Sequence, residues 1–134
     1  MNAGRELLSP ELQQEVVELR PQHVDEWAIS LPNAMEAMRQ LAQHGLAILG
    51  GDYWLRAGDG FKPAYENWAH RSRHEAEEWS AYVEDSLLMA SHALEARREY
   101  MAGQPAYLVI VATSESAFER LPDVRPGQPP ETQQ

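Results

Sequence analysis

The sequence predicts a single α+β domain, with three helices packed on a small, mostly antiparallel sheet of about three strands. Segments with helical spacing of apolar residues alternate with short apolar runs that are typical of buried strands. Glycine and proline separate these segments, and 134 residues suffice for one core. We place the domain at residues 1–112 and predict that the polar, proline-rich residues 113–134 form a disordered tail.

The first predicted helix runs from Pro10 to Leu19. Ser9 followed by Pro10 is typical of a helix start, because serine accepts a hydrogen bond from a first-turn N–H and proline needs no donor there. Leu12, Val16 and Leu19 recur at spacings of four and three. This spacing predicts one apolar stripe along the helix.

A second helix is predicted to open at residues 30–33, Ser-Leu-Pro-Asn, and to end at Gly45, which favours a left-handed cap. The apolar residues 46–49 that follow predict a buried strand. Gly50 and Gly51 then indicate a β-bulge or a place where another backbone approaches closely.

The next segment predicts a β-hairpin. Residues 57–60, Ala-Gly-Asp-Gly, form a turn, and residues 61–68 return as an antiparallel strand. Pro63 cannot donate a ladder hydrogen bond, so we expect it at a sheet edge or at a bulge.

The longest predicted helix starts at residues 72–75, Ser-Arg-His-Glu, which have the spacing of a capping box, and it ends at Gly103. One face of this helix carries the apolar residues Ala76, Trp79, Val83, Leu87, Ala90, Leu94 and Met101. Residues 106–112 are rich in β-branched side chains and predict the central strand of the sheet.

Charge and composition exclude several classes of function. The 21 acidic and 11 basic residues give a net charge of −10, which disfavours nucleic acid and anionic membranes as partners and favours a basic protein. Solubility alone is an equally good reason for such acidity. There is no cysteine, and the longest apolar run is far shorter than a membrane span of about 20 residues. We therefore expect a cytoplasmic protein.

The order of these elements resembles the immunity protein 40 family of bacterial polymorphic toxin systems over about residues 24–112. The residues that carry the resemblance are Trp27-Ala28-Ile29, Ala47-Ile48-Leu49-Gly50-Gly51-Asp52, Asn67-Trp68, and Ser86 with Ala90. The resemblance implies a protein that neutralises a cognate toxin by binding it directly. It transfers no catalytic residue, metal or cofactor, and we predict none.

The hairpin supplies the first predicted partner-binding residues, Asp52, Tyr53, Trp54 and Trp68. Asp52 is placed to pair with a basic residue of the partner, although it could equally satisfy backbone donors in its own turn. Trp54 is the better interface anchor, whereas Trp68 has buried cross-strand packing as its alternative.

The start of the long helix supplies the remaining predicted contacts, which are acidic: Glu75, Glu77, Glu78, Glu84 and Asp85. Acids near a helix N-terminus complement its dipole, which is a structural reason for some of them. No basic residue follows within the helix before Arg97, so we also interpret the cluster as a surface that blocks a basic toxin site.

Two other functions remain open. His70 and His74 are four residues apart and could bind zinc on one helix, and with Asp52 they could form a small metal-dependent enzyme, although Ser72 as the helix cap opposes this geometry. The chain could also be a regulatory subunit that binds a protein unrelated to toxins.

Overall fold

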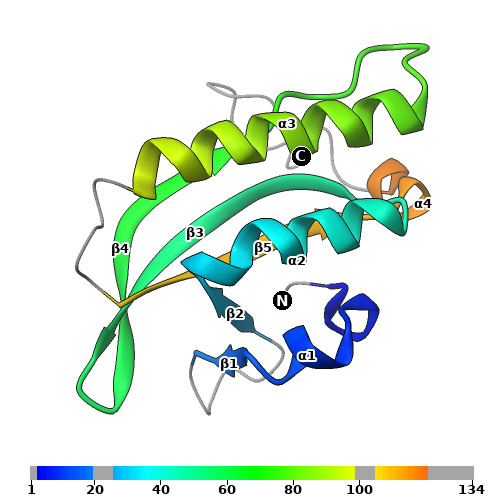
Figure 1. Cartoon of the computed structure of the whole chain (residues 1–134). Coiled ribbons are helices and arrows are strands. Elements are labelled where there is room, and N and C mark those ends of the chain that lie inside the picture. Colours follow the sequence, from blue (N-terminus) through cyan, green and yellow to red (C-terminus); the bar gives the residue numbers. More distant parts are fainter. Residues whose placement is uncertain (1–2, 20–25, 99–104, 121–134) are drawn as a thin grey trace, which may run out of the picture.

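The computed structural model describes residues 3–19, 26–98 and 105–120 (Figure 1). Within these ranges the chain forms one antiparallel sheet of five strands in the order β1-β2-β5-β3-β4. The strands are β1 (Val16–Glu18), β2 (Trp27–Ser30), β3 (Ala47–Ala57), β4 (Gly60–Ala69) and β5 (Ala106–Thr113). The helices are the 3₁₀-helix η1 (Arg5–Leu7) and the α-helices α1 (Pro10–Gln13), α2 (Leu31–Gln43), α3 (Trp79–Arg98) and α4 (Glu115–Glu119).

The predicted α+β class is confirmed, but the described residues contain more elements than predicted. Helices α2 and α3 lie side by side over one face of the sheet (Figure 1). The main core lies between these helices and the sheet, and includes Met38 and Leu41 of α2 together with Leu108 and Ile110 of β5. The prediction that β5 is central is also confirmed, because it pairs with both β2 and β3. None of the described helices combines the length and apolar character that crossing a membrane requires.

The first predicted helix is wrong beyond Gln13. Ser9 does cap α1, and its hydroxyl accepts from the Leu12 backbone N–H at 3.3 Å. Residues Val16–Glu18, however, form strand β1 and pair with β2. The supposed stripe is divided: Leu12 lies in the main core, whereas Leu19 packs with Ala28 and Val109 on the opposite face of the sheet.

The longest helix begins at Trp79 and not at Ser72. Ala76 has a φ of 66°, which is incompatible with a right-handed helix. The Glu77 carboxylate instead accepts a hydrogen bond from the His74 backbone N–H at 2.9 Å. Residues 70–78 therefore form a loop that leads into α3. The predicted helix end, with Met101 and Gly103, lies outside the described residues.

The hairpin and its glycines agree with the predictions. Gly45 and Gly58 have φ values of 83° and 60°, as expected for a helix cap and a tight turn. The β3–β5 register shifts between Ile48 and Gly50, which confirms the bulge. Strand β4, which contains Pro63, lies at the edge of the sheet.

Residues after Thr113 begin with a helix, where the sequence predicted a tail. The Ser114 hydroxyl accepts from the Ala117 backbone N–H and caps α4. Phe118 of α4 packs on Trp79 and Tyr82 at ring separations of 5.5 Å. The part of the predicted tail from residue 121 to residue 134 lies outside the described residues.

Candidate protein-binding surface

The residues predicted from the hairpin lie on opposite faces of the sheet. Tyr53 faces α3, is 1% exposed, and donates a hydrogen bond to the Ala93 carbonyl at 3.4 Å. Neighbouring strand residues alternate between faces, so Asp52 and Trp54 point away from the helices. Asp52 is exposed there, whereas Trp54 is half-buried against the cluster that contains Val109. Contrary to the prediction, Tyr53 is a core residue, and its burial raises the pKa of its phenol to about 12.

Trp68 lies on the helix-covered face, with its ring 6.0 Å from that of Tyr53. The ring packs directly over the backbone of Gly51, where any Cβ would collide with it. Trp68 and Trp54 therefore do not pair across the hairpin. The indole Nε1 of Trp68 is buried and has no hydrogen-bond partner among the described residues. The predicted alternative of packing describes Trp68 better than a fully exposed anchor.

Two of the predicted acidic contacts, Glu77 and Asp85, are held by Arg71. The guanidinium nitrogens Nη1 and Nη2 bind the Glu77 carboxylate at 3.0 and 2.8 Å. Nε and Nη2 both lie 3.0 Å from Asp85 Oδ2. Glu77 and Asp85 thus fix the loop to α3, and Arg71 neutralises much of the negative charge that the prediction offered to a partner.

Arg73 supplies a second base to the same region. It donates hydrogen bonds to the Glu77 carbonyl oxygen at 2.7 and 3.0 Å and pairs with Glu115 of α4 at 3.1 Å. Its guanidinium also lies over the Trp79 ring at 5.2 Å. Since both arginines fold back onto α3, the start of this helix is not a continuous negative surface.

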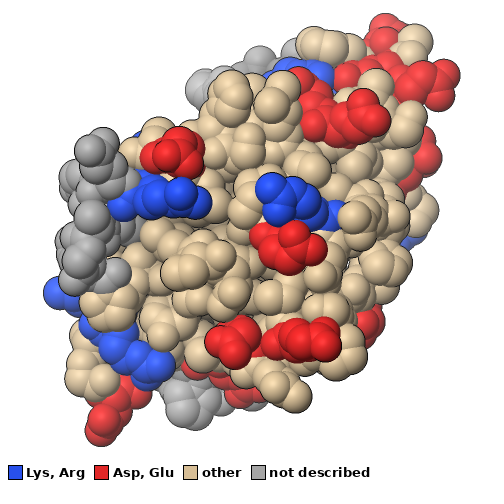
Figure 2. Space-filling model, viewed as in Figure 1, with Lys and Arg blue, Asp and Glu red and all other residues tan. Residues whose placement is uncertain are grey.

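Glu75, Glu78 and Glu84 are the predicted acids that remain exposed. Figure 2 shows the face of the molecule that carries α2 and α3. Uncharged side chains cover most of this face, with basic and acidic side chains next to each other near its centre, and further acidic side chains gather toward its upper right and lower edges. The acidity of this face is therefore greatest around its margin, where charge can steer a partner without being buried.

The Arg71–Glu77 pair makes stability depend on pH. The hydrogen bond from Arg71 lowers the pKa of Glu77 to about 2, from 4.5. A lowered pKa stabilises the fold above pH 4.5, and this contribution is lost as the pH falls toward 2. We expect Glu77→Gln to be less stable than wild type at pH 7, and the difference to narrow as the pH falls from about 5 to 2. Urea unfolding across this range tests it; a difference independent of pH would contradict it.

The two predicted histidines do not form a metal site in the described residues. His70 has a side chain that is 1% exposed, and its Nε2 lies 3.4 Å from Asp85 Oδ2 without hydrogen bonding to it. Burial lowers the pKa of His70. His74 is exposed in the loop, and Asp52 lies on the other face of the sheet. No group of three or more possible metal ligands is present in the described ranges.

Helix α3 carries exposed apolar side chains that the sequence analysis missed. Leu88 and Met89 are 54% and 44% exposed. The sequence does indicate this exposure, because residues 87–90, Leu-Leu-Met-Ala, form a continuous apolar run. Four consecutive apolar residues cannot all face the core of a surface helix. Exposed apolar groups of this size are typical of protein-binding surfaces when they cluster.

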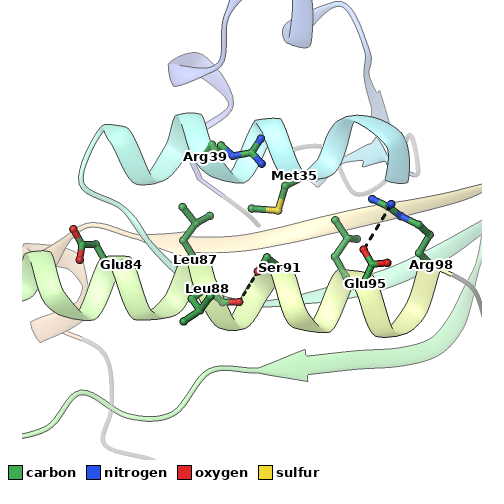
Figure 3. Close-up of a pocket in the computed structure, with 9 residues that line it drawn as sticks. Met35, Arg39, Glu84, Leu87, Leu88, Ser91, Glu95 and Arg98 are labelled. Carbon is green, nitrogen blue, oxygen red and sulfur yellow. Dashed lines mark hydrogen bonds and ion pairs between the residues drawn. The ribbon is translucent and has the colours of Figure 1, made fainter.

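Leu88 lines a groove of about 500 Å³ between α2 and α3 (Figure 3). Met35 of α2 and Leu87 of α3 form its apolar centre. Charged residues surround that centre: Arg39, Glu84, Glu95 and Arg98. Two ion pairs occupy this rim, Arg39–Glu36 at 3.1 Å and Arg98–Glu95 at 3.6 Å.

Met89 lines a second groove, of about 550 Å³, on the other side of α3. Trp68 and Ala69 of β4 and Ala93 of α3 contribute to its lining. A further aromatic residue, Tyr65, is 86% exposed on the same strand. These two grooves, on opposite sides of α3, are alternative candidate binding sites.

The sequence model of the family described as Immunity protein 40 matches residues 18–112. No curated protein matches the chain.

Proposed function

The chain belongs to the Immunity protein 40 family, and from this premise we propose that it binds and neutralises a cognate toxin protein in the cytoplasm of the producing cell. The carrying observation is the family match, which spans β2 to β5 together with α2 and α3. Both candidate grooves lie within the matched residues. Inhibition by binding requires a surface that matches the toxin and no catalytic group.

The ionisable residues near the grooves support binding over catalysis. Arg71 forms ion pairs with both Glu77 and Asp85. His70 is enclosed between this network and the Tyr82 ring, at a ring separation of 5.1 Å. The paired charges hold the loop in place and His70 is buried, whereas a catalytic acid or base must reach a substrate.

The charge of the chain favours a basic toxin. A net charge of −10 attracts a positively charged protein and speeds its association. Glu75, Glu78 and Glu84 are exposed and can contribute to this field. A nuclease is one such toxin, because its nucleic-acid site is basic.

Co-expression tests the proposed function. The protein encoded next to this chain is produced in cells with and without it, and growth is measured. We expect the neighbour to arrest growth alone and the pair to grow, with both proteins co-purifying. A neighbour that is harmless, or equally toxic in both cultures, would contradict the proposal.

A further inference from the structure

Tyr65 is held in a conformation that bulky residues rarely adopt. Its φ is 59°, in the left-handed region, and its ring is 86% exposed. This conformation is unfavourable for an L-residue with a large side chain, and the exposed ring of Tyr65 is not buried in a way that would offset the cost. A backbone outlier that presents an aromatic ring to solvent points to a role outside the fold.

A bulge in β4 places Tyr65 in this position. Asp52 pairs with Asn67 and Trp54 with Pro63, so residues 64–66 of β4 stand opposite one residue of β3. Both neighbours of Tyr65 are anchored. Ala64 packs on the main core, and the Glu66 carboxylate pairs with Arg97 of α3 at 2.8 Å. The ring is thus presented from a fixed backbone, which reduces the entropy lost on binding.

The groove between α3 and β4 leads toward this bulge. It extends from Arg71 in the loop to Trp68 in β4 on one side, and along α3 from Asp85 to Ala93 on the other. Arg97, which holds the bulge, stands one helical turn beyond Ala93. Tyr65 therefore follows the groove at its Ala93 end.

Two features of the groove indicate the chemistry of its occupant. Met89 is 44% exposed in its wall, and a flexible thioether adapts to apolar and aromatic side chains. The Trp68 Nε1 is a buried donor that lacks a partner among the described residues. An unpaired buried N–H is unfavourable, so an occupant that offers an acceptor after a small ring movement is favoured.

We propose that the α3–β4 groove and Tyr65 together form the toxin-contacting surface, with Tyr65 and Met89 as its anchors. The occupant is a toxin segment that inserts an apolar or aromatic side chain and offers a backbone carbonyl. This inference rests on the proposed function.

The charge and the edge strand favour a toxin over a second copy of this chain. Two copies that each carry a net charge of −10 repel one another. Pairing of two β4 edges is also opposed, because Pro63 lacks an N–H and the bulge interrupts the ladder.

The α2–α3 groove is the less favourable alternative. Its rim carries the ion pairs Arg39–Glu36 and Arg98–Glu95, whose side chains are more exposed than those of the Arg71–Asp85 pair in the α3–β4 groove. A partner in the α2–α3 groove would therefore displace more of the water that solvates these charges. The described residues place no strained, outward-pointing aromatic residue beside it.

Neighbouring residues of α3 provide a matched test. Met89 and Leu88 have similar exposure but line opposite grooves. The probe is the protein encoded next to this chain. Its Kd is measured calorimetrically for wild type and for Tyr65→Ala, Met89→Ala and Leu88→Ala, and circular dichroism and thermal unfolding check that each variant is folded. We expect the first two variants to bind at least about 10-fold more weakly, and Leu88→Ala to stay within about 2-fold of wild type. Tyr65→Gly, which suits the left-handed backbone, keeps the test valid if Tyr65→Ala folds poorly.

The outcomes separate this inference from the proposed function. If wild type binds and protects while Tyr65→Gly and Met89→Ala bind equally well, the surface assignment is wrong and the immunity function stands. Loss of binding only in Leu88→Ala would move the site to the α2–α3 groove. A wild-type dimer that Met89→Ala converts to a monomer would make a second copy the occupant. A wild type that neither binds nor protects would contradict the proposed function itself.

Discussion

Gly50→Ala is expected to lower the free energy of unfolding by about 3 kcal/mol. A Cβ at Gly50 would collide with the Trp68 carbonyl oxygen and lie 3.3 Å from the Ala69 Cα. Both are backbone atoms in the pairing of β3 with β4, so they cannot move without breaking the ladder. Urea unfolding of the variant measures the loss.

Gly60→Ala is the matched control in the same hairpin. A Cβ at Gly60 would meet no atom within 4 Å. We expect its stability to change by no more than about 1 kcal/mol, with a gain favoured because alanine restricts the unfolded chain. The loss of stability in Gly51→Ala should lie between those of the Gly50 and Gly60 variants, since its Cβ would meet side chains of Trp68 and Leu108 that can shift. Equal stability of the Gly50 and Gly60 variants would contradict the close contact inferred between Gly50 and the backbone of β4.

Ser86→Ala is expected to destabilise the protein by about 2 kcal/mol. Ser86 is fully buried in α3, and its hydroxyl accepts from the Ile48 backbone N–H at 2.8 Å while donating to the Val83 carbonyl at 2.7 Å. Ile48 lies where the register of β3 shifts against β5. The variant would leave this strand N–H buried without its hydroxyl partner.

Ser91→Ala separates this effect from a general effect of serine in the helix. The Ser91 hydroxyl donates to the Leu88 carbonyl at 2.7 Å, in the same local pattern as Ser86, but on the exposed side of α3. We expect a change within about 0.5 kcal/mol. Chemical unfolding of both variants tests the difference, and a similar loss in both would refute a specific bond to the bulge.

Several predictions from sequence were sound because they depended on local chemistry. Gly45 and Gly58 occupy the left-handed positions that their turns require, and Pro63 lies in an edge strand. The run from Ala106 to Thr113 is the central strand, as its β-branched residues indicated. The helix predicted from apolar periodicity was wrong at Val16–Glu18, which form a strand. The same apolar spacing also fits a short strand, with Leu12 before it and Leu19 after it on opposite faces of the sheet.

The candidate site depended on contacts that spacing does not reveal. Nothing local in the sequence indicated that Arg71 would take Glu77 and Asp85 out of the acidic surface. Tyr65 has its left-handed φ at a bulge in the pairing of β4 with β3, and its neighbour Glu66 is held by an ion pair to Arg97, which is distant in the sequence.

By itself, the sequence determined the α+β class, the acidic charge, the hairpin with its glycines and the resemblance to an immunity protein. These features follow from residue type and short-range spacing, where turn chemistry and hydrophobic pattern decide the outcome. Only the tertiary structure decided that Tyr53 is buried, that Asp52 and Trp68 lie on different faces, and that Met89 and Trp68 line one groove between α3 and β4. The physical reason is that β-pairing sets which face each side chain occupies, and the one-residue bulge between Ile48 and Gly50 changes that face for the residues of β3 that follow it.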